Sequence, residues 1–346
     1  MKDSSRYRKL SWLFAFFLLP AIIAFSAEVP EELAKRIDKV IEKAHSRPLK
    51  SDANTPWVVM HAVVAFEKDL KVYDVAAGKK LNAIEYLTKH AKYDDKLIYQ
   101  DVAGVPTLKT RGKGDKSFLV QDHVDQFLFA YADAGVPLDH AILSRSGRKF
   151  TVNDKLDFAK TGFKDDQELG WTIVATSTYL PFDEQWQADS GKKYRTEDIM
   201  ALAIQRDPRR ETEGGPHHLY GVAYALDKYL KQGGQLKGTW KQARAYLDKY
   251  VALTQEYQQA DGAFSGSVFF RASRPRTPRQ LVSSTGHALE WMSVALSAEQ
   301  LKEKWVLKAV ERLVTDMEKF PTEVFSDGGL YHAVHALRRL REATGK

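Results

Sequence analysis

Histidine and tryptophan recur along the chain at the start of segments that share one composition. Each of these ring residues precedes a run of small and apolar residues, and most runs end in a larger apolar residue near the tenth position. Histidine serves proteins as a general base, a hydrogen-bond donor or a metal ligand, so histidines at one repeated position could build a site. The recurring ring residues are His61, His123, Trp171, His218, His287 and His332.

The elements that must position these residues are helices. The ring residues lie 45 to 69 residues apart, and the base interval is 45–48 residues. A repeat of this length with two helices per unit is typical of stacked helical hairpins. The chain therefore predicts an all-α fold, an α/α toroid of about six hairpins, with an open α-solenoid as the alternative. Helical periodicity indicates helices over about 30–46, 56–69, 77–92, 121–135, 152–162, 167–180, 195–206, 216–232, 238–259, 280–296, 298–319 and 329–343.

Three irregular stretches interrupt this pattern, at 93–120, 138–151 and 260–279. The first mixes short β-like patches with Gly and Pro and predicts a long loop that could include a small hairpin. Long loops in a compact array are commonly functional. We expect a single toroid domain over 28–346 that carries these loops.

The first 26 residues have the layout of a secretory signal peptide. Four basic residues precede an apolar run from about Leu10 to Phe25, and small residues follow it. Cleavage near Ala24–Ser26 and retention as an N-terminal anchor are both open. The sequence therefore predicts an exported protein, periplasmic or secreted, or membrane-anchored if the signal stays. Its removal lowers the formal charge from +7 to about +4 and leaves no basic run of the kind that binds nucleic acid.

If the inner helices are parallel, their starts meet at one mouth of the ring. Free N–H groups and the helix dipole make such a mouth attractive to anions. Two basic loops lead into it, over 205–211 and 270–279, and the second holds four arginines within nine residues. Arginine pairs with carboxylate, sulfate or phosphate. The predicted ligand-binding residues are His61, His123, Trp171, His217, His332, Arg271, Arg274, Arg276, Glu290 and Asp327.

An acidic glycan is the ligand that an exported, cationic mouth of this kind favours. A polysaccharide lyase needs a neutraliser for the uronate carboxylate, a base for the C5 proton and an acid for the leaving oxygen. Arg274 or Arg276 could neutralise the carboxylate. The catalytic candidates are His218 or His287 as the base and Tyr220 or Tyr331 as the acid. A glycosidase needs two carboxylates instead, for which Glu213, Glu290 and Asp327 are the candidates.

Cofactor chemistry is restricted by composition. The chain has no cysteine, which excludes disulfides, cysteine-ligated zinc and iron–sulfur clusters. A metal site is a separate, weaker hypothesis, in which His217 and His218 meet His287 and Glu290. His287 and Glu290 are three residues apart and share one helix face. The favoured interpretation has no metal and no cofactor, and it leaves the oligomeric state open.

One short segment resembles a known superfamily. Residues 258–264 read Q-x-x-x-G-x-F, similar to the QW motif of the prenyltransferase and squalene-cyclase repeat superfamily, and residues 326–330 repeat its Asp-Gly part. The resemblance implies an α/α toroid with an axial cavity. The Asp-rich acid of the triterpene cyclases and the zinc-binding cysteine of the protein prenyltransferases are absent, so it does not imply those activities. A non-catalytic envelope scaffold and a terpenoid-binding protein are the alternative functions.

Overall fold

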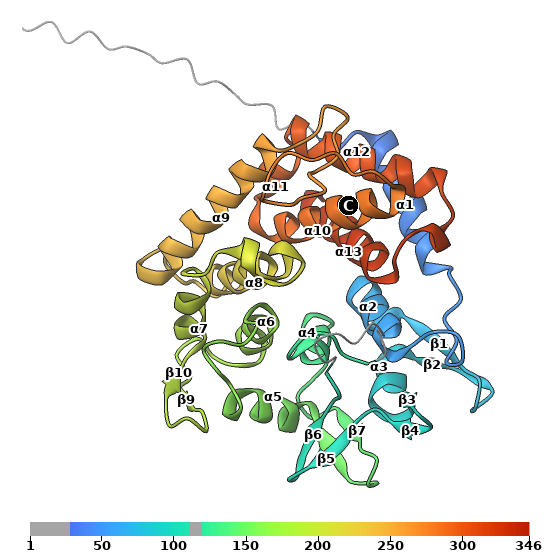
Figure 1. The fold of residues 1–346 in the computed structure, drawn as a ribbon, viewed down its shortest axis with the longest axis vertical. Coiled ribbons are helices and arrows are strands. Elements are labelled where there is room, and N and C mark those ends of the chain that lie inside the picture. Colours follow the sequence, from blue (N-terminus) through green and yellow to red (C-terminus); the bar gives the residue numbers. More distant parts are fainter. Residues whose placement is uncertain (1–27, 111–119, 346) are drawn as a thin grey trace, which may run out of the picture.

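The computed structural model describes residues 28–110 and 120–345, and the expected signal segment at 1–26 lies outside them. The described chain is mostly helical, which confirms the all-α fold class, and its β-structure consists of short two-stranded hairpins. No helix in these ranges combines the length and apolar character that crossing a bilayer requires. Figure 1 shows the helices gathered around one centre.

Six helices form the inner layer. Each packs against the next in chain order, and the last of them also packs against the first. Their apolar residues are spread around the helix rather than confined to a stripe, which is typical of helices covered on all sides. They are α2 (Pro56–Phe66), α4 (Gln126–Asp133), α6 (Gly170–Tyr179), α8 (Pro216–Lys231), α10 (Pro278–Ala295) and α13 (Asp327–Thr344).

Amphipathic helices cover this layer from outside. In α1 the buried residues Leu33, Ile37, Val40 and Ala44 recur at three- and four-residue spacing, so one stripe packs inward while charged residues face solvent. Helix α1 packs on α12 and α13, and α9 packs on α7 and α8. The outer helices are α1 (Glu31–His45), α5 (Val152–Thr161), α7 (Thr196–Ala203), α9 (Gly238–Glu256) and α12 (Lys304–Lys319).

The helix expected over 77–92 is confirmed over 83–90 and is wrong before it, where a strand forms. Residues 71–82 form an antiparallel hairpin of β1 (Lys71–Asp74) and β2 (Lys79–Asn82), whose turn contains Gly78 at a φ of +64°. A short α3 (Ala83–Glu85), capped by the Asn82 side chain, and a five-residue π-helix (Tyr86–His90) follow. Val72 and Leu81 are buried on the same face of the hairpin, so packing against the core favours strands here.

Two of the stretches expected to be irregular contain hairpins, and the third does not. Residues 260–277 contain neither helix nor strand, as expected. The remaining hairpins pair β3 (Lys92–Tyr93) with β4 (Lys96–Leu97), β5 (Gln100–Val102) with β6 (Val105–Thr107), β7 (Ala141–Leu143) with β8 (Lys149–Thr151), and β9 (Trp186–Gln187) with β10 (Lys193–Tyr194).

The helix expected over 298–319 is interrupted after α11 (Ala298–Leu301), whose Ser297–Gln300 capping box starts a separate turn.

The Q-x-x-x-G-x-F segment lies in the chain between the outer helix α9 and the inner helix α10, and it contacts the outer helix α12. The Gln258 side-chain amide donates to the carbonyl oxygens of Gly262 and Trp305, at 2.9 and 2.8 Å. Gly262 has a φ of +97°, and a Cβ there would lie 2.4 Å from the Lys308 carbonyl oxygen, so only glycine fits. The segment thus fixes the end of α9 against α12.

Candidate metal centre

Five histidines from five inner segments meet at the centre of the helix layer. We call His61, His123, His217, His287 and His332 the histidine cluster. The His217 ring lies 5.2 Å from the His123 ring, 5.2 Å from that of His287 and 5.1 Å from that of His332, measured between centroids. All five side chains are buried. Residues up to 271 positions apart in the sequence therefore share one small volume.

Two of these rings are oriented by the backbone of their own helix. Nδ1 of His61 donates to the carbonyl oxygen of Trp57 at 2.8 Å, and Nδ1 of His287 donates to that of Ser283 at 2.7 Å. A carbonyl oxygen only accepts hydrogen bonds, so each neutral ring carries its proton on Nδ1 and a lone pair on Nε2. Nε2 of His287 is then available as a metal ligand, whereas Nε2 of His61 accepts from the Gln126 side-chain amide at 3.4 Å.

Two further rings are oriented by buried or half-buried carboxylates. Nδ1 of His332 donates to Glu290 at 2.8 Å, and Nδ1 of His123 donates to Glu168 at 2.9 Å. Metal-ligating histidines almost always donate their second ring nitrogen to a carboxylate or a backbone carbonyl in this way. Four members of the histidine cluster therefore have the outer hydrogen bond that a metal-bound imidazole needs.

His217 at the centre of the cluster is unusual. It is 3% exposed, and within the described residues neither of its ring nitrogens has a hydrogen-bond partner. Leaving a buried polar group unsatisfied costs about 1–3 kcal/mol. Its neighbours are other imidazoles and Trp171, whose ring centroid is 4.7 Å away. A cation bound at the centre would give one of the two His217 ring nitrogens a partner, which no described side chain does.

The donor set fits a first-row transition metal. Ligand nitrogens of His217, His287 and His332 lie within 4.8 Å of one another. Tetrahedral zinc with Zn–N bonds of about 2.0–2.1 Å is commonly held by three histidines in enzymes, and the fourth position is left for water or substrate. His123, Glu168 and His217 form a second such group. Since Glu168 already accepts from Nδ1 of His123, we interpret it as an orienting group rather than a ligand.

Burial favours the neutral, metal-binding form of three members of the cluster. It lowers the pKa of His217 and of His61 well below the ordinary value. Burial and His332 lower the pKa of His287 to about 4. Neutral imidazole is the form that ligates metals.

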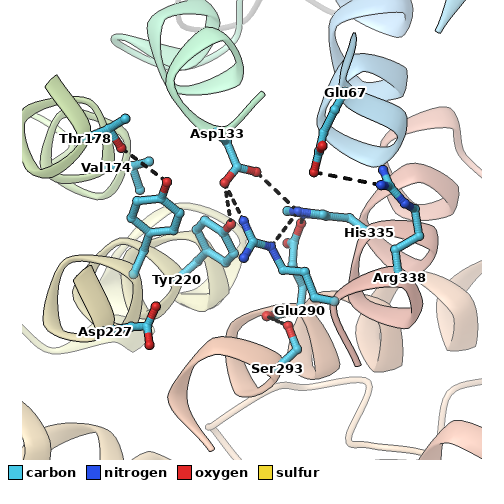
Figure 2. Close-up of polar contacts among 12 residues, drawn as sticks. Glu67, Asp133, Val174, Thr178, Tyr220, Asp227, Glu290, Ser293, His335 and Arg338 are labelled. Carbon is cyan, nitrogen blue, oxygen red and sulfur yellow. Dashed lines mark hydrogen bonds and ion pairs between the residues drawn. The ribbon is translucent and has the colours of Figure 1, made fainter. Parts of the chain in front are cut away.

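A buried charged network lies directly beside the cluster. Glu290 also accepts from Nδ1 of His335 at 2.7 Å, and Nε2 of His335 lies 3.2 Å from Asp133. Asp133 in turn pairs with Arg339 and accepts from the Tyr220 hydroxyl. Figure 2 shows His335 between Asp133 and Glu290. The orientation of His332 is thus set by groups on four inner helices, α4, α8, α10 and α13.

The structure separates the proposed lyase residues. His218 points away from the cluster, and its Nε2 donates to the Ala203 carbonyl oxygen at 3.0 Å. Tyr220 is buried against Asp133, and burial raises its pKa well above the ordinary value. Tyr331 packs against Phe66, and burial raises its pKa to about 12. Only His287 among the four catalytic candidates belongs to the cluster.

Three arginines of the basic loop, Arg271, Arg274 and Arg276, and Asp327 also lie apart from the cluster. Arg274 and Arg276 line a surface pocket of about 650 Å³ with Arg312, and Asp261 pairs with both Arg274 and Arg312. Arg271 is exposed, and Asp327 pairs with Arg47. Of the predicted ligand-binding residues, the structure brings together His61, His123, Trp171, His217 and His332, with Glu290 directly behind them.

Sequence reasoning missed the residues that orient the cluster. His335, Asp133 and Arg339 were not candidates, and neither was Glu168. His335 follows His332 by three residues, which places both on one face of α13, and this spacing was a usable signal. Asp133 and Glu168 carry no local signal, because they are defined only by their contacts across helices.

Comparisons of this chain with protein-family models, with curated proteins and with solved structures find no significant match.

Proposed function

We propose that this protein binds a transition-metal ion at the axis of a closed α/α ring, and that the bound ion serves as a catalytic centre. The ligands are His217, His287 and His332. The rings of His61 and His123 lie next to these ligands. Three nitrogen ligands leave a position for water or substrate, where the ion supplies Lewis-acid chemistry. The contact between α2 and α13 supports closure of the ring over an open solenoid.

The observation that carries this proposal is the combination of an unpartnered, buried His217 with neighbours whose Nδ1 atoms are already engaged outward. Here the outward hydrogen bonds leave lone pairs for the interior, which is the arrangement of a ligand set.

The alternative functions fit the axis less well. A scaffold predicts an axis filled by apolar side chains, and a terpenoid-binding protein predicts an apolar cavity. The described axis instead holds buried histidines together with Glu290, Asp133 and Arg339. Export through the N-terminal segment and an acidic carbohydrate as ligand remain parts of the proposal, and the ligand is treated further below.

Metal titration tests the proposal. The mature chain is dialysed against a chelator and titrated with Zn²⁺ and Co²⁺ by calorimetry and visible absorption. We expect one high-affinity ion per chain, and a loss of at least 100-fold in affinity for each of His217→Ala, His287→Ala and His332→Ala. His45→Ala, at an exposed histidine, is the matched control. Equal binding by the wild-type protein and a folded His217→Ala variant would reject the proposal.

A further inference from the structure

One surface pocket reaches the histidine cluster. It has a volume of about 410 Å³, and His287 is the member of the cluster that lines it. Gln280, Ser283, Ser284 and His287 recur at three- and four-residue spacing, so they form one face of α10 that leads from the surface to the ligand. We call this the His287 pocket. Its size suits a small polar molecule.

The charge distribution of the His287 pocket favours an anion. Three inner helices present their N-termini to it, through Pro216 at the start of α8, Thr277 before α10 and Ser326 before α13. N-terminal N–H groups and the helix dipole favour negative charge. Arg279 also lines the pocket, is exposed, and has no ion-pair partner among the described residues.

The rim of the pocket is held in strained backbone. Glu213 has a φ of +55° and Val268 a φ of +50°, and both line the pocket. A β-branched residue in the left-handed region is a true outlier, and such strain gathers at ligand-binding sites. The two rim segments touch, since a Cβ on Gly214 would lie 3.5 Å from Cγ2 of Val268. The rim therefore brings together the loop segments that contain Glu213 and Val268, and Arg279 lines the same pocket.

We propose that the His287 pocket is the substrate entrance of the metal centre and admits a small hydroxylated anion, a sugar acid or a sugar phosphate. This inference rests on the proposed metal function. Arg279 and the three helix N-termini hold the oxyanion, whereas Ser283, Ser284 and Glu213 bind hydroxyl groups. The bound molecule then reaches the ion on the His287 side.

Cobalt-loaded protein provides the test, because the visible spectrum of Co²⁺ reports directly on its ligands. The probes are D-glucuronate, D-glucose 6-phosphate and uncharged D-glucose. We expect saturable spectral changes with the two anions and none with glucose. The anion that binds with the higher affinity shows whether the site prefers a carboxylate or a phosphate. Arg279→Gln should lower the affinity for the anion at least tenfold and leave the affinity for cobalt unchanged. Arg276→Gln, in the neighbouring pocket, is the control.

The outcomes separate the two proposals. Cobalt binding without any response to either anion would overturn the pocket and leave the metal centre standing. A response that is equal in the wild-type and Arg279→Gln proteins would also overturn the pocket. If cobalt does not bind, the metal centre fails, and calorimetry of the same anions on the metal-free protein decides whether an Arg279-dependent anion pocket exists alone.

Discussion

The carboxylate of Glu290 on α10 accepts a 2.8 Å hydrogen bond from Nδ1 of His332 on α13, and the same carboxylate accepts from His335 one turn later. Glu290 therefore fixes both the tautomer and the ring orientation of a candidate ligand. Burial raises the pKa of Glu290, but the hydrogen bonds that its carboxylate accepts from His332 and His335 hold that pKa below its ordinary value. An ionised carboxylate behind an imidazole makes that imidazole a better metal ligand.

Replacing Glu290 by Gln should weaken metal binding by about 10- to 100-fold, since the neutral amide no longer stabilises the proton on Nδ1 of His332. The measurement is a competitive zinc titration against a coloured chelator. Glu299→Gln, at an exposed position, is the control and should bind like the wild type. An unchanged zinc affinity in a folded Glu290→Gln protein would show that Glu290 does not orient His332 for metal binding.

Metal addition should stabilise the folded protein. An ion that binds only the native state adds about 2.7 kcal/mol at a free concentration 100 times its Kd. Thermal unfolding with and without Zn²⁺ measures this as a rise in Tm. The His217→Ala variant should show no rise, because the central ligand is missing. A shift of the same size in this variant would place the ion elsewhere.

The pair of Asp133 and Arg339 makes a pH-dependent contribution to stability. Burial alone would raise the pKa of Asp133, but Arg339 and the hydrogen bond from His335 outweigh burial and lower it. A lowered folded pKa contributes stability above the unfolded pKa of about 3.9, and this stability is lost as the pH falls through the folded value. Asp133→Asn should cost about 3–5 kcal/mol at pH 7, since it leaves Arg339 without its buried partner.

Denaturant unfolding from pH 7 to pH 3 checks this prediction. The difference in unfolding free energy between wild type and Asp133→Asn should be constant down to about pH 4 and shrink below it. Asp38→Asn removes the exposed carboxylate that pairs with Arg341 and should cost about 0–1 kcal/mol. If the difference in unfolding free energy between wild type and the Asp133 variant grew as the pH falls, it would contradict a lowered pKa of Asp133 in the folded state.

The contact between Gly221 on α8 and Gly170 on α6 sets the depth of His217. A Cβ on Gly221 would lie 2.4 Å from the Gly170 carbonyl oxygen, and one on Gly170 would lie 2.6 Å from that of His217. Gly221→Ala should destabilise the protein by about 1–3 kcal/mol through overpacking and weaken metal binding by moving α8. Gly162→Ala, where the nearest contact is 3.1 Å, should have a smaller effect on both thermal stability and zinc titration.

The helical class, most inner and outer helices, and the recurrence of histidine at their starts could be predicted from local patterns. Apolar periodicity and helix caps act within a few residues, so they can be recognised without the fold. The same patterns predicted helix over 79–82, where Leu81 instead pairs with Val72 and packs into the core as part of a hairpin.

Which histidines face the centre depends on how the helices pack. Adjacent helix residues differ by about 100° in direction, so His217 and His218 cannot both point inward, and the sequence does not say which one does. The close packing of α8 on α6 at Gly170 and Gly221 fixes the rotation of α8 and turns His217 into the cluster. The groups that orient the ligands, Glu290 and Glu168, come from other segments of the chain, and only folding brings them to the rings.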